Sequence, residues 1–533
     1  MAESRVGRSG AAVARGIAAN TAALAAARIS GLLAAVAVTP ILLSRLGAAR
    51  FGTWSIISGL VALVSLADLG LSKTAVREVA RTVEVSDPTV AILALKLVRY
   101  WGLAIAGLLM VLTVATWPVL ADLVPRLGVG SDYRYCALFV ITSFAIDAFA
   151  APWRAVLEGK RRFSDVAAIS TVAAVVIALG DAFAVILSKG LPGLGMVAVA
   201  GSSLQATLLR SRSLRHGAAF RSRFKGFPRH RLHPLLAYGT RVQVSNVASV
   251  VNNDTDRLVV GGIAGAATAG WFDLGSKLVN GLRLLPFLAL STTFPLAAQL
   301  VAEGKRDELT ALYYRATHRL AVFSFTSGAV FIVCSRPLVE LWLGRQIPFA
   351  AKTLTILVPG CTLAIVGGAA TTLCWAEGRP GIPARYSVIT AIANVAITVP
   401  AVIIVGPIGA PVGTSLAGAL GIVYLLARFH RDPDRPAALL WRAIGIPFVS
   451  SALAGVTMAL AARQIHFSGR LSSAVTVLAL GSGTVLVVAA SLLILGLIEW
   501  LRGSSHLSLV QAVMSSATGS SPSSTGVPSD AVR

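Results

Sequence analysis

Charged side chains occur inside two long apolar segments of this chain, between residues 235 and 300. Arg241, Asp256, Lys277 and Arg283 lie there among predominantly hydrophobic residues. A charge in the hydrocarbon core of a membrane costs roughly 2.5–3.5 kcal/mol on insertion scales, so such residues usually mark a binding site or a pathway. Arginine suits a phosphate because it is always charged and donates paired hydrogen bonds. A buried aspartate suits H+ or Na+.

Helical periodicity places these residues on two polar faces. One face of the first segment holds Arg241, Ser245, Ser249, Asn252 and Asp256, with Asn246, Asn253 and Arg257 beside it. One face of the second segment holds Asp273, Ser276, Lys277, Asn280 and Arg283. Two polar faces directed at each other predict a water-filled cavity between the helices. Amides and hydroxyls in such a cavity can hydrogen-bond sugar hydroxyls, while the bases attract an anion.

A corresponding pair of segments near the N-terminus also carries buried charge, with Arg28 deep in the first segment and Asp68 near the end of the second. The predicted substrate-binding residues are Arg28, Arg241, Lys277, Arg283, Asn246, Asn252, Asn253 and Asn280. The predicted ion-coupling or gating residues are Asp68, Asp256, Arg257 and Asp273. A structural alternative stays open: Asp273 and Lys277, four residues apart, can neutralise each other, as can Asp254 and Arg257 at a spacing of three.

The composition predicts a protein that crosses a membrane many times. The chain is 55% hydrophobic and 13% charged, with a mean hydropathy of +0.76, whereas soluble domains are about 25% charged. Apolar runs of about 20 residues, which suffice to span a ~30 Å hydrocarbon core, recur about fourteen times. They lie near 17–43, 51–72, 99–121, 133–151, 165–188, 190–209, 235–262, 268–300, 317–340, 353–375, 383–404, 408–427, 443–462 and 472–501. We therefore predict an all-α polytopic membrane protein with about 14 transmembrane helices.

The net charge of +24 raises the possibility of a nucleic-acid partner. Membrane topology explains more, because the basic residues lie mostly in loops on one side, as the positive-inside rule requires of the cytoplasmic side. We predict a multi-pass protein of the cytoplasmic (inner) membrane, with both termini cytoplasmic and no nucleic-acid partner. The densest basic cluster, residues 210–231, is interpreted as a topology signal in preference to a binding site for anionic lipid head groups.

A short internal repeat divides the chain. Residues 47–54 (GAARFGTW) match residues 265–272 (GAATAGWF) at an offset of 218. Because six helices per unit is an even number, the two copies share one orientation and are related by a pseudo-two-fold axis along the membrane normal. The predicted organisation is an N-terminal six-helix lobe at 1–209, a basic cytoplasmic linker at 210–234, a C-terminal six-helix lobe at 235–428, two extra helices at 429–502 and a disordered cytoplasmic tail at 503–533.

Several short motifs resemble those of bacterial polysaccharide (O-antigen-type) repeat-unit flippases. They are residues 46–54 (LGAARFGTW), 67–71 (ADLGL), 157–163 (LEGKRRF) and 256–261 (DRLVVG), the last followed by 270–272 (GWF). This family belongs to the multidrug/oligosaccharidyl-lipid/polysaccharide exporter superfamily. The resemblance implies two six-helix lobes that alternate between inward and outward access. The implied cargo is an oligosaccharide on a polyprenyl diphosphate, moved from the cytoplasmic to the outer leaflet for surface polysaccharide biosynthesis, with a polymerase or glycosyltransferases as possible partners.

Other functions have weaker support in the sequence. An exporter of small cations in the same superfamily is one alternative, although acids and aromatics should then dominate the cavity. A membrane glycosyltransferase or polysaccharide polymerase is another, but no large external loop is present, and the DxD patterns at 254–256 and 432–434 lie in an apolar helix and a short loop. No GxxxxGK[ST] loop or metal-ligand spacing occurs. We expect no catalytic residue, metal or cofactor, and predict secondary transport coupled to H+ or Na+ rather than an enzyme.

Overall fold

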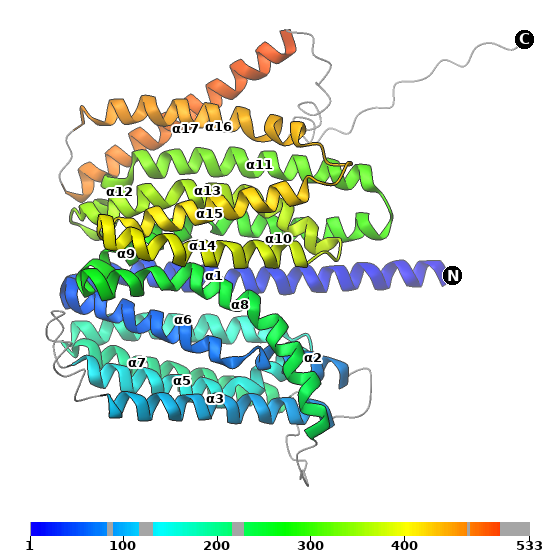
Figure 1. Cartoon of the computed structure of the whole chain (residues 1–533), viewed down its shortest axis with the longest axis vertical. Helices are drawn as coiled ribbons and strands as arrows, with labels where there is room; N and C mark the ends of the chain where they lie inside the picture. Colours follow the sequence, from blue (N-terminus) through cyan, green and yellow to red (C-terminus); the bar gives the residue numbers. More distant parts are fainter. Residues whose placement is uncertain (1, 83–88, 117–131, 216–228, 466–468, 502–533) are drawn as a thin grey trace, which may run out of the picture.

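The computed structural model describes residues 2–82, 89–116, 132–215, 229–465 and 469–501, and this part of the chain is built from helices (Figure 1). The first helices are α1 (Ala2–Val64), the 3-10 helix η1 (Ser65–Asp68), α2 (Leu71–Thr82), α3 (Thr89–Ala115), α5 (Tyr133–Gly159), α6 (Phe163–Ile186) and α7 (Gly190–Arg215). The remaining helices are α8 (Arg229–Ala264), α9 (Ala266–Leu282), α10 (Leu284–Ala302), α11 (Arg306–Val333), α12 (Ser335–Leu343), α13 (Pro348–Ala376), α14 (Gly381–Val405), α15 (Gly409–Phe429), α16 (Ala437–Ala462) and α17 (Arg470–Leu501).

The number of membrane-crossing segments agrees with the prediction. Twelve helices of the described chain are long and apolar enough to cross a membrane. One of them, Ile29–Val64, belongs to α1, which turns back on itself at Gly47 (Figure 1). Helix α8, with 36 residues, is long enough to cross as well but is not among the twelve. Dividing α1 at Gly47 and adding α8 gives the fourteen crossing segments expected from the sequence.

The two segments of the internal repeat make the same turn. Gly47 has φ 77° and ψ 169°, and Gly265, between α8 and α9, has φ 87° and ψ 162°. A positive φ of this kind favours glycine, which lacks the Cβ atom that restricts other residues. Both turns lie at one end of the helices, here called the Gly47 end. The opposite end holds the turn between α10 and α11 and is called the Glu303 end. The lobe boundaries stay a prediction, and the tail from residue 503 lies outside the described residues.

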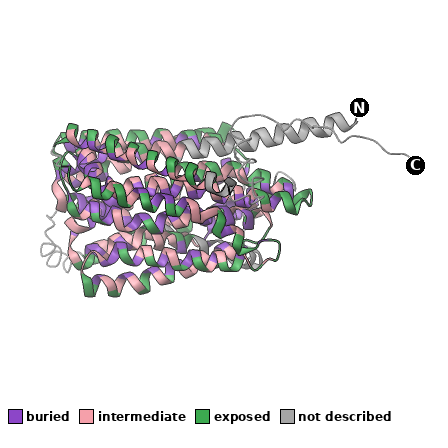
Figure 2. Ribbon diagram, turned by 90° about the horizontal axis from the view of Figure 1, so that it is seen from above, coloured by how far each residue is buried: buried purple, intermediate pink, exposed green. Residues whose placement is uncertain are grey.

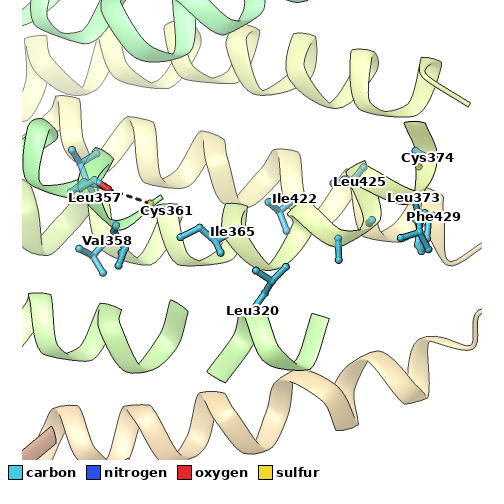
Figure 3. Packing of buried hydrophobic residues seen from close by; sticks show 14 of the residues in the cluster. Leu320, Leu357, Val358, Cys361, Ile365, Leu373, Cys374, Ile422, Leu425 and Phe429 are labelled. Carbon is cyan, nitrogen blue, oxygen red and sulfur yellow. Dashed lines mark hydrogen bonds between the residues drawn. The ribbon is translucent and has the colours of Figure 1, made fainter. Parts of the chain in front are cut away.

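Helix packing brings early and late segments together. Helices α3, α5, α6 and α7 form one group, in which α3 packs on α5 while α5, α6 and α7 contact α1. Helices α11, α13, α14, α15 and α16 form a second group (Figure 1). Helices α8 and α9 pack against α1. Within the second group α13 is central, because its apolar residues are buried between α11 and α15 (Figure 3). Large apolar side chains such as Leu112, Val423 and Leu486 are exposed, as expected where a membrane would cover them. Figure 2 shows exposed residues along the outer helices.

The long segment at 266–302 is broken in the middle. Helix α9 ends at Leu282 and α10 begins at Leu284, so Arg283 occupies the junction. Pro286, in the first turn of α10, has no N–H to donate to the carbonyl of Leu282, and this removes a bond that a continuous helix would make. Pro40, by contrast, lies inside α1. The break places Arg283 between the last turn of α9 and the first turn of α10.

Candidate functional site

A polar cavity of about 390 Å³ lies between α8, α9, α10, α13, α14 and α15. The predicted residues that line it are Asn252, Asn253, Asp256, Asn280 and Arg283. Further polar residues that line it are Ser249, Ser276, Tyr386, Ser387, Thr390, Asn394, Thr414 and Ser415. Parts of the two polar faces predicted from the sequence thus line one cavity, whereas Asp273 and Lys277 of the second face do not line it. Helices α14 and α15 complete its wall.

Asp256 is the most buried charged group of this cavity. Its exposed fraction is 3%, and the Thr414 hydroxyl donates a hydrogen bond to Oδ2. Asn394 lies beside the same carboxylate, and Thr398 donates a hydrogen bond of 3.3 Å to the Asn394 Oδ1 atom. Within the described chain, Asp256 has no ion pair, and its Oδ1 is buried without a hydrogen-bond partner. A buried carboxylate surrounded by amide and hydroxyl groups but no base is suited to a proton or a small cation.

Arg283 supplies the positive charge of the cavity. Its side chain is exposed, and its Nε donates to the Cys361 Sγ at 3.2 Å. No carboxylate of the described chain pairs with it, so its remaining N–H groups are open to an anion. Tyr386 and Asn280 line the same space. The arrangement can therefore hold a group that combines negative charge with hydroxyls.

The predicted asparagines differ in their surroundings. Asn280 is exposed, Asn252 has a buried Oδ1 without a partner among the described residues, and the Asn253 amide donates to the Ser249 carbonyl at 2.7 Å. Asn246 donates to the Gln243 Oε1 at 3.3 Å and does not line the cavity. Three of the four asparagines are therefore placed where a ligand can reach them.

The other predicted charges form a connected chain of ion pairs. Arg257 pairs with Asp254 and, at 3.5 Å, with Asp273, whose second oxygen pairs with Lys277 at 2.8 Å. The Lys277 ammonium also lies 5.0 Å from the centre of the Phe51 ring in α1. Two bases and two acids neutralise one another here, as in the structural alternative considered for these spacings. The roles of Lys277, Arg257 and Asp273 stay predictions, but their side chains already have partners.

Asp68 lies in a separate cavity. This cavity, of about 500 Å³, is formed by α2, α3, α5 and α7 and also contains Lys73, Asp147, Arg154 and Glu158. The Asp68 carboxylate accepts hydrogen bonds from the backbone and side chain of Ser72. The side chains of Arg28 and Arg241 lie outside the described residues, so their predicted part in the site is not placed.

Sequence reasoning missed the polar side chains that α14 and α15 contribute to the cavity. Asn394 and Thr414 lie in helices that are otherwise strongly apolar. An asparagine inside such a helix is itself a signal, because an amide in hydrocarbon needs a partner. Which cavity it faces depends on how α14 and α15 pack against α8, and a single sequence does not specify that packing.

The first and second halves of the chain touch at both ends of the helices. At the Gly47 end, a Cβ atom on Gly52 would overlap the Ala266 carbonyl, and one on Gly270 would lie 2.9 Å from Gly52 Cα. At the Glu303 end, a Cβ atom on Gly70 would overlap the Gly239 carbonyl, and Gln243 donates to the Leu66 carbonyl. Each end is thus closed by backbone contacts that only glycine allows.

Comparisons with known proteins agree with this architecture. A family profile described as "Polysaccharide biosynthesis protein" matches residues 42–349. The chain is 22% identical over 321 residues to the lipopolysaccharide biosynthesis protein WzxC of Escherichia coli (strain K12), a match that spans 59% of this chain and 61% of that protein. The structure is similar to a lipid II flippase MurJ in an inward closed conformation, with a TM-score of 0.65 and 15% identity over 89% of this chain and 97% of the other. An inward-facing multidrug resistance MATE family transporter of the MOP superfamily gives a TM-score of 0.58 and 15% identity, covering 76% and 98%.

Proposed function

This chain belongs to the family of polysaccharide biosynthesis proteins, and we propose that it acts there as a flippase for a polyprenyl-diphosphate-linked oligosaccharide. It moves the cargo from the cytoplasmic to the outer leaflet by alternating access and leaves the covalent bonds of the cargo unchanged. The prenyl chain remains in the lipid, while the diphosphate and the sugars cross within the protein.

The main support is the cavity between α8, α9, α10 and the helices α13 to α15. Arg283 offers a guanidinium group that no carboxylate of the described chain neutralises, and asparagines 252, 253 and 280 offer amides nearby. The diphosphate can bind the guanidinium charge, and the sugar hydroxyls can hydrogen-bond the amides. A cavity that offers both groups therefore fits this cargo better than a cavity with only one of them.

Asp256 is the proposed coupling group. The carboxylate is buried without a basic partner among the described residues, and Asn394 and Thr414 lie around it. Binding of H+ or Na+ would neutralise the Asp256 carboxylate, and release of the ion would leave an unfavourable buried charge. An ion gradient can in this way favour one arrangement of α8 against α14 and α15.

The ion-pair chain of Arg257, Asp273 and Lys277 is proposed to belong to a gate at the Gly47 end. It lies between α8, α9 and α1, and a Cβ atom on Gly59 of α1 would lie 2.7 Å from Arg257 Nε. Opening this end would separate α1 from α8 and α9. The positive-inside rule assigns the Glu303 end to the cytoplasm, so the Gly47 end would face the outside.

The direct test is flipping by the purified chain in liposomes. A polyprenyl-diphosphate-linked oligosaccharide is incorporated in both leaflets, a glycosidase is added outside, and the cleaved fraction is followed over time. With the protein present, cleavage should rise from about half of the cargo towards completion, faster under an imposed Na+ or H+ gradient. Cleavage that stays at the level of protein-free liposomes under every gradient would refute the proposal.

An exporter of small organic cations is the second candidate. Asp256 favours it, since an unpaired acid can bind a cation, and Phe272 and Tyr386 line the same cavity. The same liposomes distinguish the two functions when they are loaded with a fluorescent cationic dye. Gradient-driven dye transport without flipping of the lipid-linked oligosaccharide would favour the antiporter.

A further inference from the structure

Two arginines from different helices meet at one tryptophan near the Glu303 end of the first helix group. The guanidinium carbon of Arg99, in α3, lies 5.2 Å from the ring centre of Trp153, in α5, and 4.5 Å from that of Phe149. The guanidinium carbon of Arg210, in α7, lies 5.9 Å from the same Trp153 ring. Helices α3, α5 and α7 lie side by side in Figure 1.

This pair of arginines lacks a negative partner in the described chain. Among the described residues, no acidic side chain forms an ion pair with Arg99 or Arg210, and Arg99 Nε is buried without a hydrogen-bond partner. The aromatic rings hold the cations by their negative faces but do not neutralise them. Two like charges brought to one ring repel each other, so the arrangement gains stability when an anion lies between them.

Trp153 and Arg210 lie close to helix ends, where the boundary between the hydrocarbon and the lipid head groups is expected. Trp153 lies six residues before the end of α5 and Arg210 five residues before the end of α7, which is about 8–9 Å of helix in each case. Arg99 lies about 15 Å from the start of α3, and a long side chain can reach from there towards the head groups. Tyr100 and Trp101 are exposed beside it, as expected of aromatic residues at a membrane interface.

We propose that Arg99 and Arg210, held on Trp153, form a binding site for the phosphate of an anionic membrane phospholipid at the Glu303 end. Charge complementarity selects the head group, and the exposed apolar side chains of α3 accept the acyl chains. The lipid would connect α3, α5 and α7 on the outside of the helix group. The site is separate from the cavity that contains Asp256 and Arg283, so the proposal does not depend on what the chain transports.

The test measures lipid binding by native mass spectrometry of the full chain in detergent, titrated with phosphatidylglycerol or phosphatidylcholine. The double variant Arg99→Gln/Arg210→Gln should bind phosphatidylglycerol roughly 20-fold more weakly and phosphatidylcholine unchanged. The control Arg345→Gln/Arg463→Gln changes two exposed arginines at the Gly47 end and should bind both lipids like the wild type. If the double variant does not fold, Arg210→Gln alone, on an exposed residue, should still weaken phosphatidylglycerol binding several-fold.

Equal binding of phosphatidylglycerol by the wild type and the arginine variants would overturn the site, as would an equal loss in the Gly47-end control. A polyprenyl phosphate that displaces phosphatidylglycerol from the wild type at a lower concentration, and fails to do so in the double variant, would assign the site to the cargo and overturn the phospholipid proposal.

Discussion

Asp256 and Arg283 carry opposite charges in one cavity, and they do not form an ion pair with each other. Among the described residues, the hydrogen-bonding neighbours of both are neutral: Thr414 and Asn394 for the carboxylate, and Cys361 for the guanidinium. Most of the other charged residues of α8 and α9 that the structure describes are already neutralised in pairs. These two residues are therefore the ones at which a substitution should change transport more than stability.

The variant Asp256→Asn should remove the response to an ion gradient. An amide has nearly the same shape as a protonated carboxyl group but cannot bind or release the coupling ion, so transport should become independent of the gradient and at least tenfold slower. The measurement compares flipping in liposomes with and without Na+ or pH gradients. Asp434→Asn, at an exposed carboxylate of the Glu303 end, serves as the control. Gradient-stimulated flipping by Asp256→Asn at the wild-type rate would exclude Asp256 as the coupling group.

The variant Arg283→Ala should weaken binding of the diphosphate. Hydrogen bonds to charged groups contribute about 1.5–3 kcal/mol, which corresponds to roughly 10- to 100-fold in affinity. Arg283→Lys keeps the charge but loses the paired donors, so it should retain an intermediate activity. Flipping rates measured at several cargo concentrations separate binding from turnover. If the flipping rate of Arg283→Ala depended on cargo concentration as in the wild type, the diphosphate would bind at another site.

Part of this site follows from local sequence and part does not. Asp256, the asparagines and Arg283 stand out because each interrupts an apolar helix, and helical spacing puts them on common faces. The same spacing leaves Lys277 equally able to bind cargo or to pair with Asp273, and the structure shows the pair. Asn394 and Thr414 approach Asp256 through contacts between helices more than a hundred residues apart, which no local pattern encodes.

At the scale of the helices, glycines determine how closely the helices of one half approach those of the other. Gly52 in α1 and Gly270 in α9 belong to the internal repeat and touch each other across the Gly47 end. The repeat could be read from the sequence as a turn between helices, whereas the positive φ of Gly47 comes from the structure. The packing of the two copies on each other depends on the tertiary fold, because either copy alone would form the same turn.

Substitution of Gly52 should therefore destabilise the protein against the trend for helices. Glycine to alanine inside a helix usually stabilises by about 1 kcal/mol, yet a Cβ atom at Gly52 would overlap the Ala266 carbonyl and force α1 and α9 apart. Overpacking of this kind costs about 1–3 kcal/mol. The melting temperature of the purified chain should fall for Gly52→Ala and stay equal or rise for Gly107→Ala, whose position has open space. A fall of equal size in both variants would contradict the close contact.

The structure as a whole has its two halves in contact at both ends, and a carrier working by alternating access must open one end while the other stays closed. At the Gly47 end, a Cβ atom on Gly261 of α8 would touch the Ile56 side chain of α1. At the Glu303 end, the Thr74 hydroxyl of α2 donates to the Leu235 carbonyl of α8 at 3.4 Å. Helix α8 thus takes part in both contacts, so movement of α8 against the first half is the expected opening motion.

Locking either end should stop transport reversibly. The pairs Ile56→Cys/Gly261→Cys and Thr74→Cys/Leu235→Cys place two thiols at contacts that must separate, and oxidation should join them. The four native cysteines of the described chain are buried and unpaired, so their interference should be small. Flipping should fall to the protein-free level after oxidation and return after reduction, whereas each single-cysteine variant should be insensitive to both. If one of the cross-linked variants transported as fast after oxidation as it does with its thiols reduced, that end would not open during the cycle. The cargo would then have to leave the cavity sideways between helices.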